Sequence, residues 1–177
     1  MYRTDEKPGK LLGVVGWSGS GKTTLVEYLI TGLAGRGVRV NALKHSHHDV
    51  VLEPPGKDSA RFRGAGAAEV ILASPHRYAL VRELHGAAEP TLAELLSRLS
   101  PADITIVEGF KWERMPKVEV WRPSLGNPAL YLEDRDVLAV ASDAPAPAGL
   151  REGVAWLDLN DPAQVLAWIE KVFLGTA

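Results

Sequence analysis

The sequence contains no cysteine among its 177 residues. This absence excludes disulfide bonds, thiolate metal ligands and cysteine nucleophiles, and nothing in it points to an oxidising compartment. No apolar run approaches the roughly 20 residues that a membrane-spanning helix needs. Residues 1–10 are polar and lack the apolar core of a signal peptide. Together these absences predict a cytoplasmic protein that does not enter a membrane.

The chain also lacks a dominant charge, because 20 basic residues face 22 acidic ones and the formal net charge is −2. Such a balance gives no global field for collecting nucleic acid or an anionic membrane, so any anion site must be local. The length fits one domain with one hydrophobic core. We expect a flexible tail over residues 1–10 and a single nucleotide-binding domain over residues 11–177.

What the chain does contain is a glycine-rich motif of the form G-x-x-x-x-G-K-[ST] at residues 16–23. Glycines let successive backbone N–H groups converge on phosphate oxygens, and the helix that follows adds the positive end of its dipole. An apolar run at residues 11–15 precedes the motif, and apolar residues recur at helical spacing after it. We expect Lys22 to bridge the terminal phosphates and Thr23 to hold Mg²⁺. The predicted nucleotide-binding residues here are Gly16, Trp17, Ser18, Gly19, Ser20, Gly21, Lys22, Thr23 and Thr24.

Strand and helix patterns alternate along the rest of the chain. Further strands are predicted at residues 38–44, 104–107, 118–121, 137–141 and 154–157, a hairpin at 69–73 and 78–83, and helices at 58–64, at 91–96 and after Asp161. This order predicts an α/β fold: a doubly wound, mostly parallel sheet of the P-loop NTPase type with an added antiparallel hairpin.

Two carboxylates are candidates for the chemistry beside the phosphates. Glu108 ends a predicted strand, where a Walker-type site needs a carboxylate near Mg²⁺; the alternative is a solvent-facing acid. Asp49 lies in a long loop with His45, His47 and His48, where it could position water or bind Mg²⁺. These histidines favour solvated loop positions over a zinc site. The catalytic candidates are thus Lys22, Asp49 and Glu108, and the metal candidates are Thr23, Glu108 and Asp49.

Two basic groups could bind the phosphate or pyrophosphate of a second substrate. One contains Lys57, Arg61 and Arg63, and the other contains Lys111, Arg114, Lys117 and Arg122. From these we select Lys57, Arg61, Lys111 and Lys117 as a candidate anion site. A solvated charged face is the open alternative.

Recognition of the base has a weaker signal, because the chain has no Asn-Lys-x-Asp tetrad of the kind that reads guanine. Asp143 follows the predicted strand at residues 137–141. Without the rest of the tetrad, its carboxylate could by itself accept hydrogen bonds from guanine. The alternative is an aspartate that caps a turn.

Several blocks together resemble the MobB family of molybdopterin-guanine dinucleotide biosynthesis proteins. The blocks are the glycine-rich loop, Lys44-His45-Ser46-His47-His48-Asp49, Pro55-Gly56-Lys57-Asp58-Ser59, Gly64-Ala65-Gly66-Ala67, Val107-Glu108-Gly109-Phe110-Lys111 and Pro116-Lys117-Val118-Glu119-Val120. The resemblance covers about residues 10–143. It implies a GTP-binding protein with at most weak GTPase activity, Mg²⁺ as cofactor, a homodimer, and an accessory role to the guanylyltransferase that joins GMP to molybdopterin. Molybdopterin itself is a candidate ligand.

Two other functions remain open from the sequence. The loop is also similar to those of small-molecule kinases, although a kinase should carry an arginine-bearing lid and residues 123–136 hold only Arg135. A non-catalytic, nucleotide-dependent adaptor is the third possibility. Phosphate transfer to an acceptor, slow hydrolysis, or binding without turnover would distinguish the three.

Overall fold

The computed structural model describes residues 9–46, 54 and 56–175. The chain falls into two compact units: one contains Met1–His45 and Arg98–Ala177, and the other contains Ser46–Ser97. The expected tail falls largely on residues 1–8, outside the described residues. The single domain over residues 11–177 stays a prediction.

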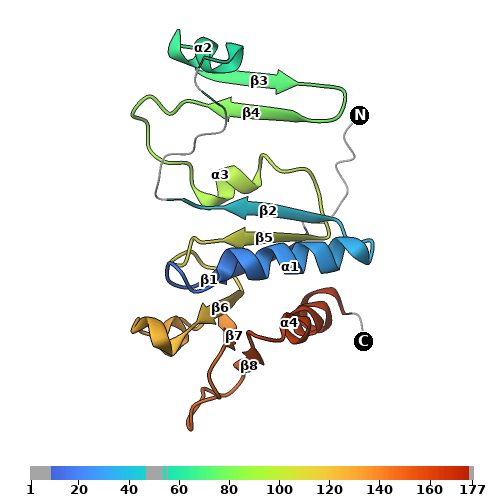
Figure 1. Cartoon of the computed structure of the whole chain (residues 1–177), viewed down its shortest axis with the longest axis vertical. Helices are drawn as coiled ribbons and strands as arrows, with labels where there is room; N and C mark the ends of the chain where they lie inside the picture. Colours follow the sequence, from blue (N-terminus) through green and yellow to red (C-terminus); the bar gives the residue numbers. More distant parts are fainter. Residues whose placement is uncertain (1–8, 47–53, 55, 176–177) are drawn as a thin grey trace. The chain divides into compact units, whose positions relative to one another are not determined.

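The first unit is built on a six-stranded sheet in the order β2-β5-β1-β6-β7-β8 (Figure 1). All of its neighbouring strands run parallel. The strands are β1 (Lys10–Val15), β2 (Val40–Lys44), β5 (Ile104–Glu108), β6 (Lys117–Trp121), β7 (Val137–Ser142) and β8 (Ala155–Asp158). Because parallel neighbours end at one edge, the loops after β1, β2 and β5 emerge together there.

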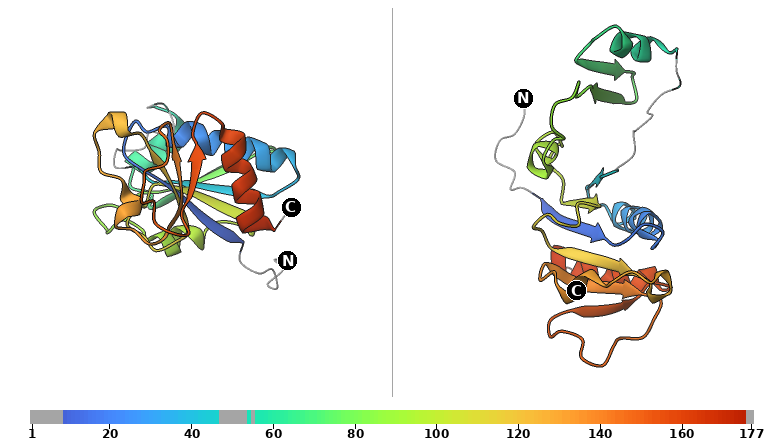
Figure 2. Two further views of the ribbon diagram at one scale, coloured as in Figure 1. Left: turned by 90° about the horizontal axis from the view of Figure 1, so that it is seen from below. Right: turned by 90° about the vertical axis from the view of Figure 1, so that its left-hand side faces the viewer.

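Helices α1 (Lys22–Gly35) and α4 (Pro162–Ile169) pack on each other and share one apolar core with the sheet (Figure 2). Leu12 and Val14 of β1 are fully buried in this core, against Leu29 and Leu33 of α1. The alternation of side chains along β1 therefore sets which face of the sheet α1 covers. A π-helical turn, η3 (Glu170–Leu174), continues α4.

A second apolar cluster contains Ala129, Tyr131, Val137, Val140 and Val154, with Trp121 and Trp156 packed against it. The rings of Tyr131, Trp121 and Trp156 meet edge to face, with centroids 5.9–6.4 Å apart. Short 3₁₀ turns, η1 (Pro123–Leu125) and η2 (Leu130–Leu132), lie in the connection from β6 to β7.

Glu119 of β6 is fully buried and fixes η2 in place. Its carboxylate accepts the backbone N–H groups of Leu130 at 2.7 Å and Tyr131 at 2.8 Å. Burial raises the pKa of this carboxyl above its ordinary value, although the two N–H groups oppose the shift.

The second unit contains α2 (Asp58–Gly64), β3 (Glu69–Ala73), β4 (Tyr78–Arg82) and α3 (Leu92–Leu96). The predicted hairpin is confirmed, but β3 and β4 pair only with each other, in a separate two-stranded sheet instead of an extension of the large one. The expected cap at the third helix is also confirmed, because Thr91 and Glu94 form a reciprocal capping box. Ile71 and Tyr78 are 65% and 73% exposed.

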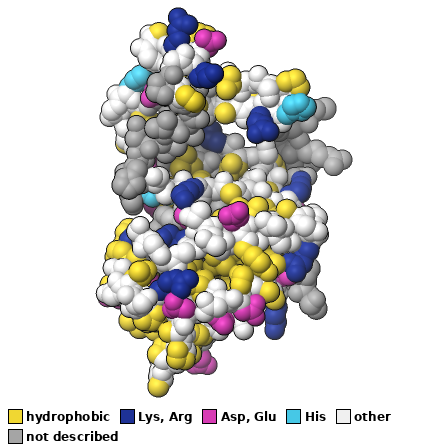
Figure 3. All heavy atoms as spheres, in the orientation of Figure 1, with side chains coloured by type: hydrophobic (Ala, Val, Ile, Leu, Met, Phe, Trp, Pro, Cys, Tyr) yellow, Lys and Arg dark blue, Asp and Glu magenta, His cyan; other side chains and the backbone are white. Residues whose placement is uncertain are grey.

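The predicted fold class is confirmed: a mostly parallel sheet with flanking helices and an antiparallel hairpin. Basic and acidic side chains are interspersed over the face drawn in Figure 3 instead of being gathered by sign. Among the described residues, no helix combines the length and the apolar character that crossing a bilayer requires.

Candidate functional site

The glycine-rich loop connects β1 to α1, and its glycines adopt backbone conformations that other residues rarely take. Gly16, Gly19 and Gly21 have φ values of +141°, +79° and +101°. A Cβ on Gly16 would also lie 2.3 Å from the carbonyl oxygen of Val120. The motif's glycines are therefore required by the backbone path itself.

Lys22 lies in the first turn of α1 and points back over the loop. Its Nζ donates to the carbonyl oxygen of Trp17 at 2.7 Å. Burial lowers the pKa of the Lys22 ammonium; Glu108 opposes this shift, while Lys111 and Lys44 add to it. Several cations thus converge on the loop, as a site for a polyanion requires.

Thr23 and Glu108 meet at the edge of the sheet. The Thr23 hydroxyl donates to Glu108 Oε1 at 2.8 Å. Val14, Glu108 and Lys44 are lateral partners in the register of β1, β5 and β2. Side chains in one lateral row of a parallel sheet point to the same face, and Val14 belongs to the core that α1 covers. The register therefore directs Glu108 and Lys44 toward the first turn of α1.

Lys44 completes this group. Its ammonium donates to Thr23 Oγ1 at 3.1 Å and pairs with Glu108 Oε1 at 3.1 Å. Glu108 is buried, whereas the Lys44 side chain is 57% exposed. One positive charge is thus already held between a hydroxyl oxygen and a buried carboxylate.

These two oxygens fit Mg²⁺ in chemistry, because Mg²⁺ prefers oxygen ligands and is usually held by one or two protein groups plus phosphate oxygens. The Lys44 ammonium lies between them, so the position already accommodates a positive charge. Within the described residues, no cluster of three or more His, Asp or Glu side chains forms a metal cage. Asp49, the third predicted ligand, lies outside the described residues, as do His47 and His48.

Arg122 connects the loop to Asp143. Its Nε donates to the carbonyl oxygen of Ser20 at 3.0 Å, and its guanidinium forms an ion pair with the Asp143 carboxylate. Asp143 is thus linked to the glycine-rich loop through Arg122. The Ser20 hydroxyl is buried and has no hydrogen-bond partner among the described residues.

Trp17 is held on two sides. Its Nε1 donates to the carbonyl oxygen of Pro128 at 2.8 Å, and Lys111 Nζ lies 3.7 Å from the centroid of its ring. Lys111 also lies 5.2 Å from the ring of Trp112, which is 73% exposed. Lys111, one of the four residues predicted to form an anion site, therefore lies beside the glycine-rich loop.

The other members of that predicted site differ in their surroundings. Lys117 is only 2% exposed, and its Nζ donates to Asp134 at 2.6 Å and to the carbonyl oxygen of Lys111 at 3.0 Å. Its selection was wrong, because a lysine buried against its own carboxylate does not offer its charge to a ligand. Lys57 and Arg61 are exposed residues of the second unit, where Arg61 pairs with Asp58 at 3.6 Å.

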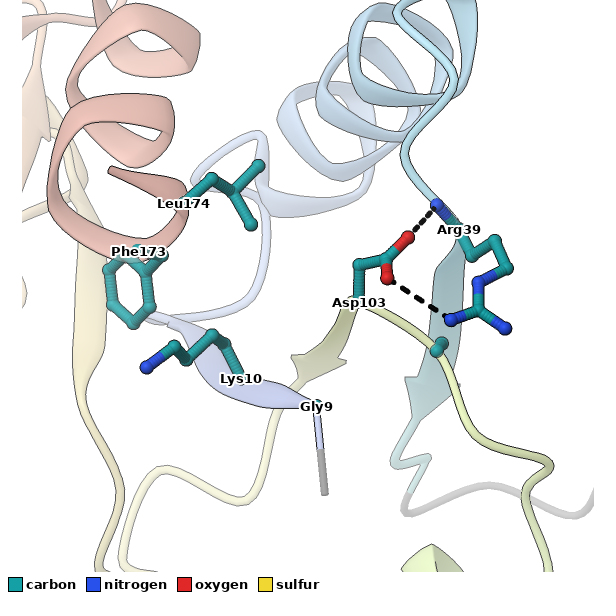
Figure 4. A pocket seen from close by; sticks show the side chains of 7 residues that line it. Gly9, Lys10, Arg39, Asp103, Phe173 and Leu174 are labelled. Carbon is teal, nitrogen blue, oxygen red and sulfur yellow. Dashed lines mark hydrogen bonds and ion pairs between the residues drawn. The ribbon is translucent and has the colours of Figure 1, made fainter. Parts of the chain in front are cut away.

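A hollow of about 370 Å³ lies at the opposite, amino-terminal end of β1 and β5 (Figure 4). Beside it, Asp103 accepts the backbone N–H of Arg39 at 2.7 Å and its guanidinium at 3.2 Å. These bonds hold the pKa of the Asp103 carboxyl below its ordinary value. They tie the start of β5 to the residue before β2, which is a structural task.

Sequence reasoning did not assign Lys44 to the metal position or Arg122 to the loop. The signal for Lys44 was available, because it ends a predicted strand as Glu108 does, and strand ends of a parallel sheet share an edge. Arg122 had no comparable local signal, since its contact with Ser20 joins residues 102 positions apart.

The chain is similar to proteins of molybdopterin-guanine dinucleotide synthesis. The family model described as MobB, molybdopterin guanine dinucleotide synthesis protein B, matches residues 11–143. The molybdopterin-guanine dinucleotide biosynthesis adapter protein of Escherichia coli (strain K12) is 44% identical over 168 residues, which cover 91% of this chain and 94% of that protein. The protein of the same name from Haemophilus influenzae is 40% identical over 163 residues, covering 90% and 87%. A crystal structure of molybdopterin-guanine biosynthesis protein B superposes with a TM-score of 0.72 at 28% identity, covering 93% of this chain and 99% of that one.

Proposed function

Because this chain belongs to the MobB family, we propose that it is an adapter in the synthesis of molybdopterin guanine dinucleotide and that it acts by binding GTP with Mg²⁺. The proposal includes weak GTPase activity and a guanylyltransferase partner. The relatives' names support the adapter role. The geometry of the site supports a triphosphate and Mg²⁺, whereas guanine and hydrolysis rest on the family resemblance.

The observation that carries the nucleotide proposal is the meeting of Thr23 with Glu108 directly beside Lys22. In this arrangement the loop's backbone N–H groups and the Lys22 ammonium hold the phosphates. Thr23 and Glu108 hold Mg²⁺, which neutralises phosphate charge when bound. Hydrolysis also requires an oriented water, and Asp49 is the residue that we propose for this task.

Titration calorimetry of the purified chain with GTP and ATP, in Mg²⁺ and in EDTA, tests the proposal. Lys22→Ala should lower GTP affinity at least about tenfold, because charge-assisted hydrogen bonds contribute about 1.5–3 kcal/mol. Glu108→Gln should keep most GTP affinity but weaken its Mg²⁺ dependence, since it retains the shape and removes the charge. Lys171→Met, which removes an exposed lysine of η3, is the matched control.

Equal GTP affinity in wild type and in folded Lys22→Ala would contradict the proposed phosphate site. Rapid phosphate transfer from GTP or ATP to a small-molecule acceptor would instead make the chain a kinase. The adapter role has its own measurement: in reactions that all contain GTP as the GMP donor, attachment of GMP to molybdopterin by a purified guanylyltransferase should rise when the chain is added. Unchanged GMP attachment would contradict the adapter role.

A further inference from the structure

We propose that Lys44 and the divalent metal are alternative occupants of the same position, so that Lys44 couples metal binding to the arrival of the nucleotide. This inference rests on the proposed function, because it concerns the same Thr23–Glu108 pair. It adds a task for a residue to which neither the motif nor the family comparison assigns one.

Lys44 occupies the space next to both oxygens of the Thr23–Glu108 pair. Lys44 Nζ lies 3.1 Å from Thr23 Oγ1 and 3.1 Å from Glu108 Oε1, while these two oxygens lie 2.8 Å apart. The ammonium contacts both oxygens that the metal would use. Since Mg²⁺ binds oxygen at about 2.0–2.1 Å, an ion bound to both oxygens on the side that the ammonium occupies would overlap Lys44 Nζ and must displace it.

Electrostatic repulsion acts in the same direction. An ammonium about 3 Å away would repel a divalent ion even in bulk water, and the repulsion is stronger at a partly buried position such as that of Glu108, where water screens charge less. Lys44 must therefore leave before or while the metal enters. Its side chain is 57% exposed, so it can leave without opening the apolar core.

Once displaced, the Lys44 ammonium needs new hydrogen-bond acceptors. The Lys22 and Lys111 ammonium groups both lie against Trp17 of the loop, where positive charge attracts an anion, and a triphosphate adds oxygens that accept an ammonium. A nucleotide therefore offers Lys44 new partners, whereas the metal alone offers none. Metal binding without nucleotide should accordingly be weak in the wild type and stronger once Lys44 is removed.

The test measures binding of Mn²⁺, as a paramagnetic substitute for Mg²⁺, by the loss of its free-ion electron paramagnetic resonance signal. Without nucleotide, Lys44→Met should bind Mn²⁺ about tenfold or more tightly than wild type, because a neighbouring positive charge has been removed. Lys171→Met should bind Mn²⁺ as the wild type does. The double variant Lys44→Met/Glu108→Gln should lose the gain, which places the new binding at this carboxylate.

Lys44→Gln serves as a second variant if Lys44→Met is poorly folded, and circular dichroism establishes folding for each. The same titrations are repeated with a non-hydrolysable GTP analogue. If the wild type binds Mn²⁺ with the analogue but Lys44→Met and wild type bind Mn²⁺ alone with equal affinity, the Lys44 inference is overturned and the proposed function stands. If the wild type binds neither the analogue nor Mn²⁺ in its presence, the proposed function fails as well.

Discussion

At the scale of the residue, Trp17 is the natural reporter of the site. It lies within the glycine-rich loop, its Nε1 donates to Pro128, and the Lys111 ammonium lies over its ring. Cations over an indole ring are attracted to its π-face, and a bound triphosphate would compete for Lys111. Any change in this pair alters the surroundings of the indole.

We therefore predict that Mg²⁺ and GTP together change tryptophan emission and that Trp17→Phe abolishes the change. The chain has five tryptophans, so a matched control is needed. Trp168→Phe replaces a ring that packs against Phe173 beside the helix core and should leave the response intact. A response that survives Trp17→Phe would place the reporter at another tryptophan.

Asp143 raises a second question at this scale, because its carboxylate pairs with Arg122, which in turn holds the loop carbonyl of Ser20. If Asp143 reads guanine, Asp143→Asn should lower GTP affinity and raise affinity for xanthosine triphosphate. The expected change in preference is about 100-fold, since a polar site left unpaired with the wrong base is strongly penalised. Competition binding with GTP, ATP and xanthosine triphosphate measures it.

The ion pair between Arg122 and Asp143 suggests a different role, in which Asp143 does not contact the base. If Asp143 only positions Arg122, then Asp143→Asn and Arg122→Met should each lower the affinities for GTP and for ATP by the same factor. Base preference would then be unchanged, and Asp143 would leave the set of base-reading residues.

At the scale of the element, the buried carboxylate of Glu119 holds η2 through the N–H groups of Leu130 and Tyr131. In Glu119→Gln, one of these N–H groups would face an amide donor. We predict a loss of about 1–3 kcal/mol in the free energy of unfolding, the cost of a buried polar group left unsatisfied. Urea denaturation measures this loss, and Glu133→Gln, an exposed residue, should change little.

The same carboxyl predicts a pH dependence. Its pKa is raised in the folded chain, so the fold binds this proton more tightly than the unfolded chain does. The resulting stabilisation is complete below the ordinary carboxyl pKa and is lost as pH rises through the raised pKa. The stability difference between wild type and Glu119→Gln should therefore be larger at pH 5 than at pH 8. A constant difference would show that the proton plays no part.

The elements themselves were largely predictable from the sequence. Apolar runs and glycine or proline stops located the strands, and the Thr91–Glu94 spacing located a helix start to the residue. Asp161 stands at the predicted helix cap, but its side chain makes no capping hydrogen bond. Periodicity identified β3 and β4 as a hairpin yet carried no information on which sheet they join.

Within the site, local motifs predicted the residues whose neighbours are close in sequence. They selected the glycine-rich loop and the strand-ending Glu108, and the structure brings Thr23 of the loop into contact with Glu108; metal binding by this pair stays a prediction. Lys117 was selected because charge composition does not reveal burial. Its partner Asp134 lies 17 positions away, so no local pattern indicated the ion pair. The position of Lys44 required the strand register.

At the scale of the whole molecule, the hairpin of the second unit is a candidate dimer surface. A two-stranded sheet is marginally stable by itself, and Ile71, Leu72 and Tyr78 are more than half exposed. A second copy of the chain would cover these side chains. This supports the homodimer that we expect from the family resemblance; the cytoplasmic location and the absence of nucleic-acid binding stay predictions.

We predict that the 19.1 kDa chain sediments as a dimer and that Tyr78→Lys shifts it toward monomer, because a buried lysine in an apolar interface is costly. Analytical ultracentrifugation over a range of concentrations measures this. Val172→Lys alters a similarly apolar exposed side chain of η3 and should not change the mass. An unchanged dimer in Tyr78→Lys would place the interface elsewhere.

The site depends on the lateral row formed by Val14, Glu108 and Lys44. It is therefore sensitive to the number of residues in β5, which amino-acid composition does not reveal. One residue inserted or deleted within β5 upstream of Glu108 would preserve an apolar strand but reverse the face to which its last side chain points. The carboxylate would then turn away from Thr23, into the opposite layer. The phase of β5 relative to β1 and β2 is therefore as necessary to the site as the Glu108 carboxylate itself.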